Sequence, residues 1–179
     1  MTDTIKRSIH FWGISYELQH NKKVFAKTRY TWGVLLRKIQ FELDDNCYIL
    51  FQRNIIFKLI NFIPFFCYNS FPNYILKLNS ITVGKTQFHL LKKYHQLNYN
   101  NNIYSFFLKK NNHVIVYKNA NHIADIKKKD WSFCERKEYD VDVFREAERD
   151  IVLIIAVYSD IIFFSSHFNY SGVKFEKTI

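Results

Sequence analysis

Three short lysine clusters are the residues of this sequence best suited to chemistry. Their members are Lys92, Lys93, Lys109, Lys110, Lys127, Lys128 and Lys129. Ammonium groups attract phosphate and carboxylate groups, so we expect these lysines to bind an anionic ligand. The first two clusters lie within residues 46–124, where nine Lys and Arg residues occur without any Asp or Glu. The alternatives are ordinary solvated lysines and a nucleic-acid contact, the latter because the aromatic Tyr94 and His95 follow Lys92 and Lys93.

Motifs for other kinds of chemistry are incomplete. Gly84-Lys85-Thr86 resembles the end of a phosphate-binding loop, but that motif needs a glycine five residues earlier, where Asn79 stands. The seven histidines include no pair with the i, i+4 spacing of a helical zinc site, and the cysteines form no Cys-x-x-Cys motif. Cys134 has no nucleophile signature around it. We therefore expect no catalytic residue, no metal and no cofactor.

The composition predicts one basic, aromatic-rich globular domain. The chain has 179 residues, a formal net charge of +10 and 18% aromatic residues, with only four Gly and two Pro. This length suits a single domain spanning 1–179, and the charge favours acidic headgroups, an acidic protein or nucleic acid as a partner. The three cysteines are too few and too widely spaced for a disulfide framework. We expect reduced thiols, mostly buried, in a cytoplasmic protein.

Two apolar segments could be confused with membrane spans. They are Asn54–Cys67 and Ile151–Phe164, each of 14 residues. A helix needs about 20 residues to cross a bilayer, so we expect both segments to belong to the core. Shallow insertion of the aromatic-rich stretch Ile55–Tyr68 into a membrane surface is the alternative for the first.

Most of the chain has the pattern of short β-strands. Runs of β-branched and aromatic residues alternate with turns in which asparagine replaces glycine, since asparagine tolerates positive φ. The expected strands are Ile9–Tyr16, Val24–Tyr30, Leu35–Leu43, Tyr48–Arg53, Tyr74–Leu78, Ile81–Phe88, Ile103–Leu108, Val114–Tyr117, Ile123–Lys127 and Tyr139–Phe144.

A single helix is expected after the last strand. Arg145–Arg149 is rich in helix formers, and the apolar run that follows is too long for an ordinary strand. A helix over Glu146–Phe164 would be apolar on all sides, and such a helix belongs in the interior of a protein. Ten or more strands followed by this helix suggest a closed sheet wrapped around it, because closure also removes exposed sheet edges.

Asp160 lies near the end of that expected helix. A buried carboxylate is costly unless it is paired or hydrogen-bonded. We therefore expect a structural carboxylate at the barrel mouth, capped by backbone amides or by a basic partner. The functional alternative is a plug that responds to pH or to ions.

The order of elements resembles the tubby C-terminal-like superfamily, which includes phospholipid scramblases, plant LURP-one-related proteins and small bacterial homologues. The resemblance covers about residues 9–166. It rests on paired hairpins such as Phe71–Lys85 and His113–Lys129, then Asp130-Trp131, the alternating strand Tyr139–Phe144 and the apolar helix with Asp160.

The resemblance implies a fold and a class of ligand. The fold is mainly β: a closed antiparallel β-barrel of about 12 strands (about residues 9–144) around a central hydrophobic helix (about 146–164), with a C-terminal tail at 165–179. Tubby proteins bind phosphoinositide headgroups and scramblases act at membranes, although Ser132–Lys137 lacks the acidic calcium-binding run of the scramblases.

We therefore expect a non-enzymatic binding module, cytoplasmic or peripheral at the membrane. Its basic face would associate with anionic phospholipid headgroups or with a membrane-associated partner. The alternative is a protein-interaction or structural module without lipid binding.

Overall fold

Twelve antiparallel strands close into a barrel around the C-terminal helix in the computed structural model. The structure describes residues 1–10, 13–32, 37–43, 46–52, 74–89, 94–109, 112–129 and 137–164. The strands are β1 (Thr2–His10), β2 (Gly13–His20), β3 (Lys23–Trp32), β4 (Arg37–Leu43), β5 (Asn46–Gln52), β6 (Tyr74–Leu78), β7 (Ile81–His89), β8 (Tyr94–Tyr99), β9 (Asn102–Lys109), β10 (His113–Lys118), β11 (Asn121–Lys129) and β12 (Lys137–Val143).

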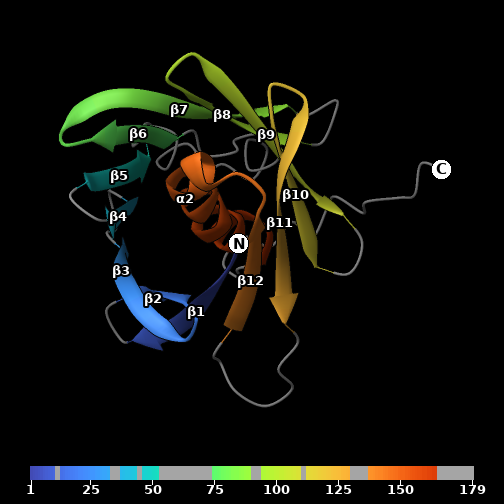
Figure 1. Cartoon of the computed structure of the whole chain (residues 1–179). Coiled ribbons are helices and arrows are strands. Elements are labelled where there is room, and N and C mark those ends of the chain that lie inside the picture. The colour runs from blue at the N-terminus through green and yellow to red at the C-terminus, as the bar shows by residue number, and fades with distance from the viewer. Residues whose placement is uncertain are drawn as a thin grey trace, which may run out of the picture.

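Each strand pairs with its neighbours in the sequence, and the first strand closes the barrel against the last. Along the closing pair the register runs from Thr2 opposite Asp142 to Arg7 opposite Lys137. Figure 1 shows the resulting ring of strands with the helix α2 inside it. The prediction of a closed, mainly β barrel around a hydrophobic helix is confirmed.

Asparagine forms the tight turns at one end of the barrel, as the sequence predicted. Asn21, Asn79, Asn100, Asn101 and Asn119 all have positive φ, between 46° and 59°. These residues lie at hairpin ends where a left-handed backbone is needed, and asparagine adopts it more readily than most residues do. The sequence therefore closes these hairpins without glycine.

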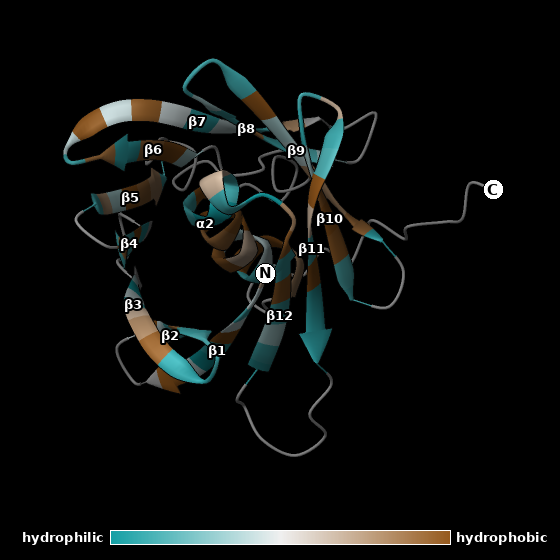
Figure 2. Ribbon diagram, viewed as in Figure 1, coloured by the Kyte–Doolittle hydropathy of each residue, from teal (hydrophilic) through white to brown (hydrophobic). Residues whose placement is uncertain are grey.

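The helical segment begins with a 3₁₀ turn at Glu146–Glu148, continues as α2 (Arg149–Ser159) and ends in a π turn at Asp160–Phe164. Every residue from Ile151 to Ile162 is buried. The predicted span of 146–164 is confirmed, because burial on all sides outweighs the weak helix propensity of the β-branched residues. Figure 2 shows apolar residues along α2 and alternating apolar and polar residues along the strands around it.

The strands β1 and β8 were not predicted, and the predicted strand Ile9–Tyr16 was wrong. The segment Ile9–Tyr16 spans the end of β1 and the start of β2, with residues 11–12 outside the described ranges. The pattern of β1 was hidden because its inward side chains include the charged Asp3 and Arg7, both buried. In β8 the inward His95 interrupts the apolar alternation in the same way.

Charged pairs fix the first turn of α2 inside the barrel. Arg149 donates to both carboxylate oxygens of the fully buried Asp3, from Nε at 2.8 Å and from Nη2 at 3.0 Å. Glu148 accepts from the Tyr104 hydroxyl at 2.6 Å and from Lys118 Nζ at 2.5 Å. The helix is thereby tied to β1, β9 and β10 at the end of the barrel where it begins.

Within the described residues, no helix has both the length and the apolar character needed to cross a bilayer.

Candidate functional site: the basic mouth of the barrel

The ladder register brings two of the predicted lysine clusters to the same end of the barrel. Lys109 at the end of β9 lies opposite His113, and His113 lies opposite Lys127 near the end of β11. The helical segment reaches the same end at Phe164, since it runs back from the end of β12 through the barrel (Figure 1). We call this end the mouth, defined by Lys109, Lys127–Lys129, Lys137 and Phe164.

Lys109 is exposed and makes no ion pair within the described ranges. It is therefore available to an external anion. Lys92, Lys93 and Lys110 lie outside the described residues. The strands that flank Lys92 and Lys93 do have their ends at the mouth, because β7 runs toward it and β8 away from it.

The third cluster is divided by the alternation of β11. Lys127 and Lys129 point outward and pair with carboxylates of β12, Lys127 with Asp142 at 3.5 Å and Lys129 with Asp140 at 2.7 Å. Lys129 also lies 3.1 Å from Glu138, and its hydrogen bond to Asp140 is the main reason that its pKa is raised. These two lysines are therefore largely neutralised by the neighbouring strand.

Lys128 has the opposite orientation and turns into the mouth. Its Nζ lies over the ring of Phe164, 5.7 Å from the centroid. Beside it, Lys137 donates from Nζ to the backbone oxygen of Phe164 at 2.5 Å. Burial lowers the pKa of Lys137, and the nearby positive charges of Arg7 and Lys128 lower it further. The negative charge of Asp160 opposes this shift.

Asp160 lies beneath these lysines, fully buried. Its carboxylate accepts from Arg7 Nη1 at 3.4 Å, from the Tyr16 hydroxyl at 2.8 Å and from the Tyr139 hydroxyl. Burial, reinforced by the charge of Asp160, raises the pKa of Tyr16 and of Tyr139, so both hydroxyls remain protonated donors. The sequence predicted a cap of backbone amides or a basic partner for Asp160; in the structure the basic partner is Arg7.

The balance of charge inside the mouth is positive. Arg7 and Asp160 offset each other, which leaves Lys128 and Lys137 as net positive charges around the half-buried ring of Phe164. No family model, curated protein or solved structure that was compared with the chain matches it. The interpretation of the mouth therefore depends on its own geometry.

Sequence reasoning missed Lys137 and Arg7 and included two lysines that are ion-paired. The alternation of Asp140 and Asp142 with apolar residues was visible in the sequence and signalled an acidic outer face on β12. Because consecutive antiparallel strands pair, that face had to lie beside Lys127 and Lys129. No comparable signal placed Arg7 next to Asp160, 153 residues away.

Other residues singled out in the sequence have structural positions. Gly84-Lys85-Thr86 lies within β7, so it is not a phosphate-binding loop between a strand and a helix. Cys47 is a free, half-buried thiol, whereas Cys134 and the whole segment Asn54–Cys67 lie beyond the described ranges. Among the described residues, no group of three His, Cys, Asp or Glu side chains could hold a metal ion.

His95 belongs to an aromatic cluster beneath the mouth. Its ring centroid lies 4.6 Å from that of Phe88, 5.2 Å from that of Phe163 and 5.8 Å from that of Phe106. With only 2% of its surface exposed, the ring is not accessible for stacking on a nucleic-acid base. Burial lowers the pKa of His95 from 6.5 to about 3.

We expect this buried histidine to make the barrel less stable in acid. The folded state resists protonation, so the contribution of His95 is complete above about pH 6.5 and is lost as pH falls from there toward about 3. The free energy of unfolding should fall by about 1.4 kcal/mol per pH unit in this window. Urea unfolding at several pH values measures the slope. His95→Phe, which keeps a ring in place, should show a shallower slope by about one proton; an unchanged slope would contradict the assignment.

Proposed function

We propose that the protein is a non-enzymatic module that binds an anionic membrane surface through the mouth of its barrel. The observation behind this proposal is that Lys128 and Lys137 contact Phe164 at the end of the barrel where the exposed Lys109 also lies. In this arrangement cations border an apolar ring at one end of the molecule. An acidic headgroup layer offers phosphates to such cations and an apolar interior to the ring.

The attraction would be mainly electrostatic. Each lysine close to an acidic leaflet contributes about 1 kcal/mol, and the interaction weakens with salt because the Debye length shortens. An apolar contribution from Ile55–Tyr68 belongs to the same proposal; this stretch lies outside the described residues, and its support is that β5 ends and β6 begins at the mouth. We place the module in the cytoplasm, peripheral at the membrane.

Vesicle flotation tests the proposal with two variants of equal charge loss. Lys109→Gln/Lys128→Gln removes two charges from the mouth, whereas Lys22→Gln/Lys23→Gln removes two exposed charges from the opposite end of the barrel. We expect the wild type to bind acidic phosphatidylglycerol vesicles at low salt and not neutral phosphatidylcholine vesicles. The mouth variant should lose about 1 kcal/mol of binding free energy per lysine, and the control much less.

A third variant isolates the ion-paired lysines. Lys127→Gln/Asp142→Asn removes one pair without changing the net charge, so binding to acidic vesicles should remain as in the wild type. Equal losses in the mouth variant and its control would show that net charge, not the mouth, is responsible. Absence of binding in every condition would remove the membrane proposal.

A different surface favours the alternative, a protein-interaction module. Ring contacts of 4.9–5.9 Å connect Phe107, Tyr117, His122 and Phe144 in a strip across β9, β10 and β11 to the residue after β12. Phe144 at the end of this strip is 53% exposed. Aromatic residues of this kind form the centres of protein interfaces. An acidic or membrane-associated protein would be the partner in this case.

We also propose a tubby-like relationship for the chain. Support comes from the twelve-stranded barrel around a C-terminal helix, which is the architecture that the resemblance implies. Lipid binding is not transferred with this proposal, because fold and function are separable. The flotation experiment addresses binding independently of the relationship.

A further inference from the structure

A second site lies on the outer wall of the barrel, across β6, β7, β8 and β9. It is a hollow of about 690 Å³, within the range of about 300–1,000 Å³ that is usual for small-molecule sites. Five asparagine or glutamine residues contribute to its lining. They are Gln96, Asn98, Asn100, Asn101 and Asn102. We call this hollow the amide groove.

The register of the sheet aligns the centre of the amide groove in one row. Ile75 lies opposite Lys85, Lys85 opposite Asn98, and Asn98 opposite Ile103. These four residues come from four adjacent strands and line the hollow. A cation and an amide therefore lie side by side between two apolar side chains.

The backbone of β7 is irregular where it lines the amide groove. The pairing of β6 with β7 shifts register between Leu76 and Lys77, which marks a bulge and bends the strand. Next to it, a Cβ on Gly84 would lie 2.4 Å from the backbone oxygen of Asn98, so only glycine allows β7 and β8 to approach this closely. The bulge and this close approach are backbone features located at the amide groove.

Its electrostatic character is that of an anion site. Among the described residues that line the amide groove there is no carboxylate, and the one charged residue is Lys85. Lys85 is exposed and has no ion pair among the described residues. An anionic group entering the groove would meet this ammonium without competition from a protein carboxylate.

The amides supply hydrogen-bonding groups of both kinds. Gln96 donates from Nε2 to Asn98 Oδ1 at 2.7 Å, which leaves Asn98 Nδ2 as a donor beside Lys85. At the end of the groove, Asn102 donates to the backbone oxygen of Asn100 at 3.0 Å. Hydroxyl groups of a sugar both donate and accept, so they match amide side chains, which do the same.

The groove offers little for a nucleobase to stack on. Tyr99 is the one aromatic residue among its described lining residues, and its half-buried ring packs inward against the core, 6.4 Å from that of Tyr104. Base recognition normally uses an exposed aromatic face. The apolar walls, Ile75 and Ile103, suit the C–H faces of a sugar ring.

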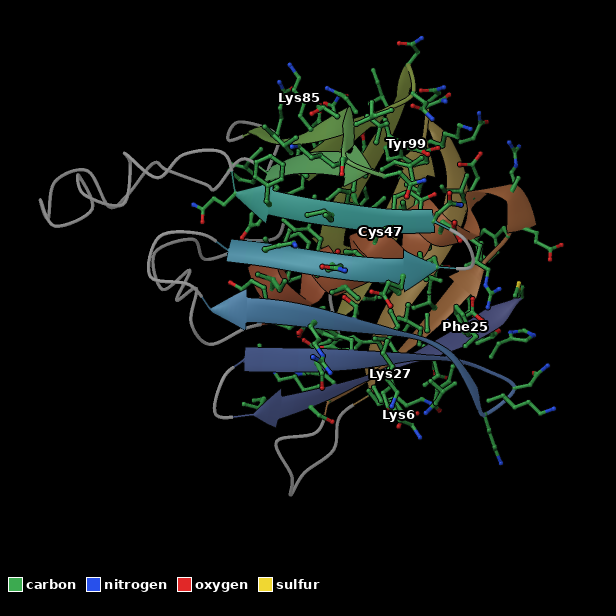
Figure 3. All side chains as sticks on the ribbon, turned by 90° about the vertical axis from the view of Figure 1, so that its left-hand side faces the viewer. Lys6, Phe25, Lys27, Cys47, Lys85 and Tyr99 are labelled. Atoms are coloured by element: carbon green, nitrogen blue, oxygen red, sulfur yellow. The ribbon has the colours of Figure 1, made fainter. Side chains whose placement is uncertain are left out.

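From these observations we infer that the amide groove binds a phosphorylated sugar, with Lys85 at the phosphoryl group and Asn98 at the phosphoryl or a ring hydroxyl. This site is independent of the proposed membrane contact. The groove lies on the wall of the barrel, whereas the lysines of the mouth lie at the barrel end. Figure 3 shows Lys85 and Tyr99 in the upper part of one side, and Lys6, the position of the control variant below, at its lower edge.

Isothermal titration with soluble probes tests the inference. The probes are glucose 6-phosphate, fructose 6-phosphate, ribose 5-phosphate, the matching unphosphorylated sugars, inorganic phosphate and adenosine monophosphate. We expect at least one sugar phosphate to bind with a Kd of about 1 mM or lower. It should bind at least about tenfold more tightly than its sugar and than inorganic phosphate. Adenosine monophosphate should show no advantage over ribose 5-phosphate.

Two variants connect binding to the groove. Lys85→Gln should raise the Kd of the sugar phosphate by about tenfold or more, because a charge-assisted hydrogen bond is lost. Asn98→Asp keeps the shape but adds a negative charge next to Lys85, so it should abolish binding of the phosphorylated probe. Lys6→Gln, at an exposed position on β1, is the matched control and should bind as the wild type does.

The outcomes separate this inference from the membrane proposal. Sugar-phosphate binding that survives Lys109→Gln/Lys128→Gln supports an independent groove. The inference is overturned if no sugar phosphate binds, if Lys6→Gln weakens binding as much as Lys85→Gln, or if Lys85→Gln affects only phosphatidylglycerol vesicles. In the last case the ligand of Lys85 would be a lipid headgroup and not a soluble phosphorylated sugar.

Discussion

Asp160→Leu is expected to lower the free energy of unfolding by about 3–5 kcal/mol, the usual cost of removing one partner from a buried ion pair. The substitution leaves the guanidinium of Arg7 buried without its carboxylate, which Nη1 contacts, while Arg7 Nε has no hydrogen-bond partner among the described residues even in the wild type. The hydroxyls of Tyr16 and Tyr139 lose their acceptor at the same time. Urea or thermal unfolding measures the change.

Two further variants distinguish charge from packing. Asp160→Asn keeps an acceptor for the tyrosines and should cost less than Asp160→Leu. The double variant Arg7→Met/Asp160→Leu removes both charges and should recover part of the loss, since apolar replacement of a whole buried pair is often neutral. Vesicle binding, corrected for the folded fraction, should change less than stability does. Intact stability with lost binding would instead identify Asp160 as a ligand-binding residue.

Much of the fold could be predicted because its signals are local. Asparagine turns such as Asn79 and Asn119, and the alternation of Tyr139–Phe144, depend only on neighbouring residues. The apolar run after Arg149 predicted an interior helix, and such a helix requires an enclosing sheet. The strand β1 was missed because local pattern rules treat charged residues as outward-facing, whereas its inward charges are paired with the helix.

The candidate site was less predictable, for a geometric reason. Which lysines remain accessible depends on the partner strand and on alternation. Lys127 and Lys129 have acidic neighbours across the ladder, whereas Lys128, between them, turns inward. The amide groove depends on register across four strands and on the bulge in β7. Lys85 had been noticed in the sequence only as part of an incomplete motif.

The inward charges of β1 match the two ends of the helix. Asp3 and Arg7 are four residues apart, about 13 Å along a strand, and pair with Arg149 and Asp160, which are eleven residues apart, about 16 Å along a helix. Both elements run toward the mouth (Figure 1). A helix inserted in the opposite direction would bring Asp3 toward Asp160 and Arg7 toward Arg149. We therefore expect the two pairs to favour this direction of the helix over the opposite one.

Reversing the charge at position 149 tests whether these ion pairs favour one direction of the helix. Arg149→Asp places a carboxylate beside the buried Asp3 and should cost about 3 kcal/mol, the lower end of the range for buried pairs because Arg149 is 22% exposed. The exchange Asp3→Arg/Arg149→Asp restores opposite charges and should recover most of this loss; the remainder reflects His20, which lies 2.9 Å from Asp3. Arg145→Asp, at an exposed position before the helix, should change stability by less than about 0.5 kcal/mol. Urea unfolding of the four proteins decides the matter, because an exchange variant no more stable than Arg149→Asp would show that the charges do not specify the helix direction.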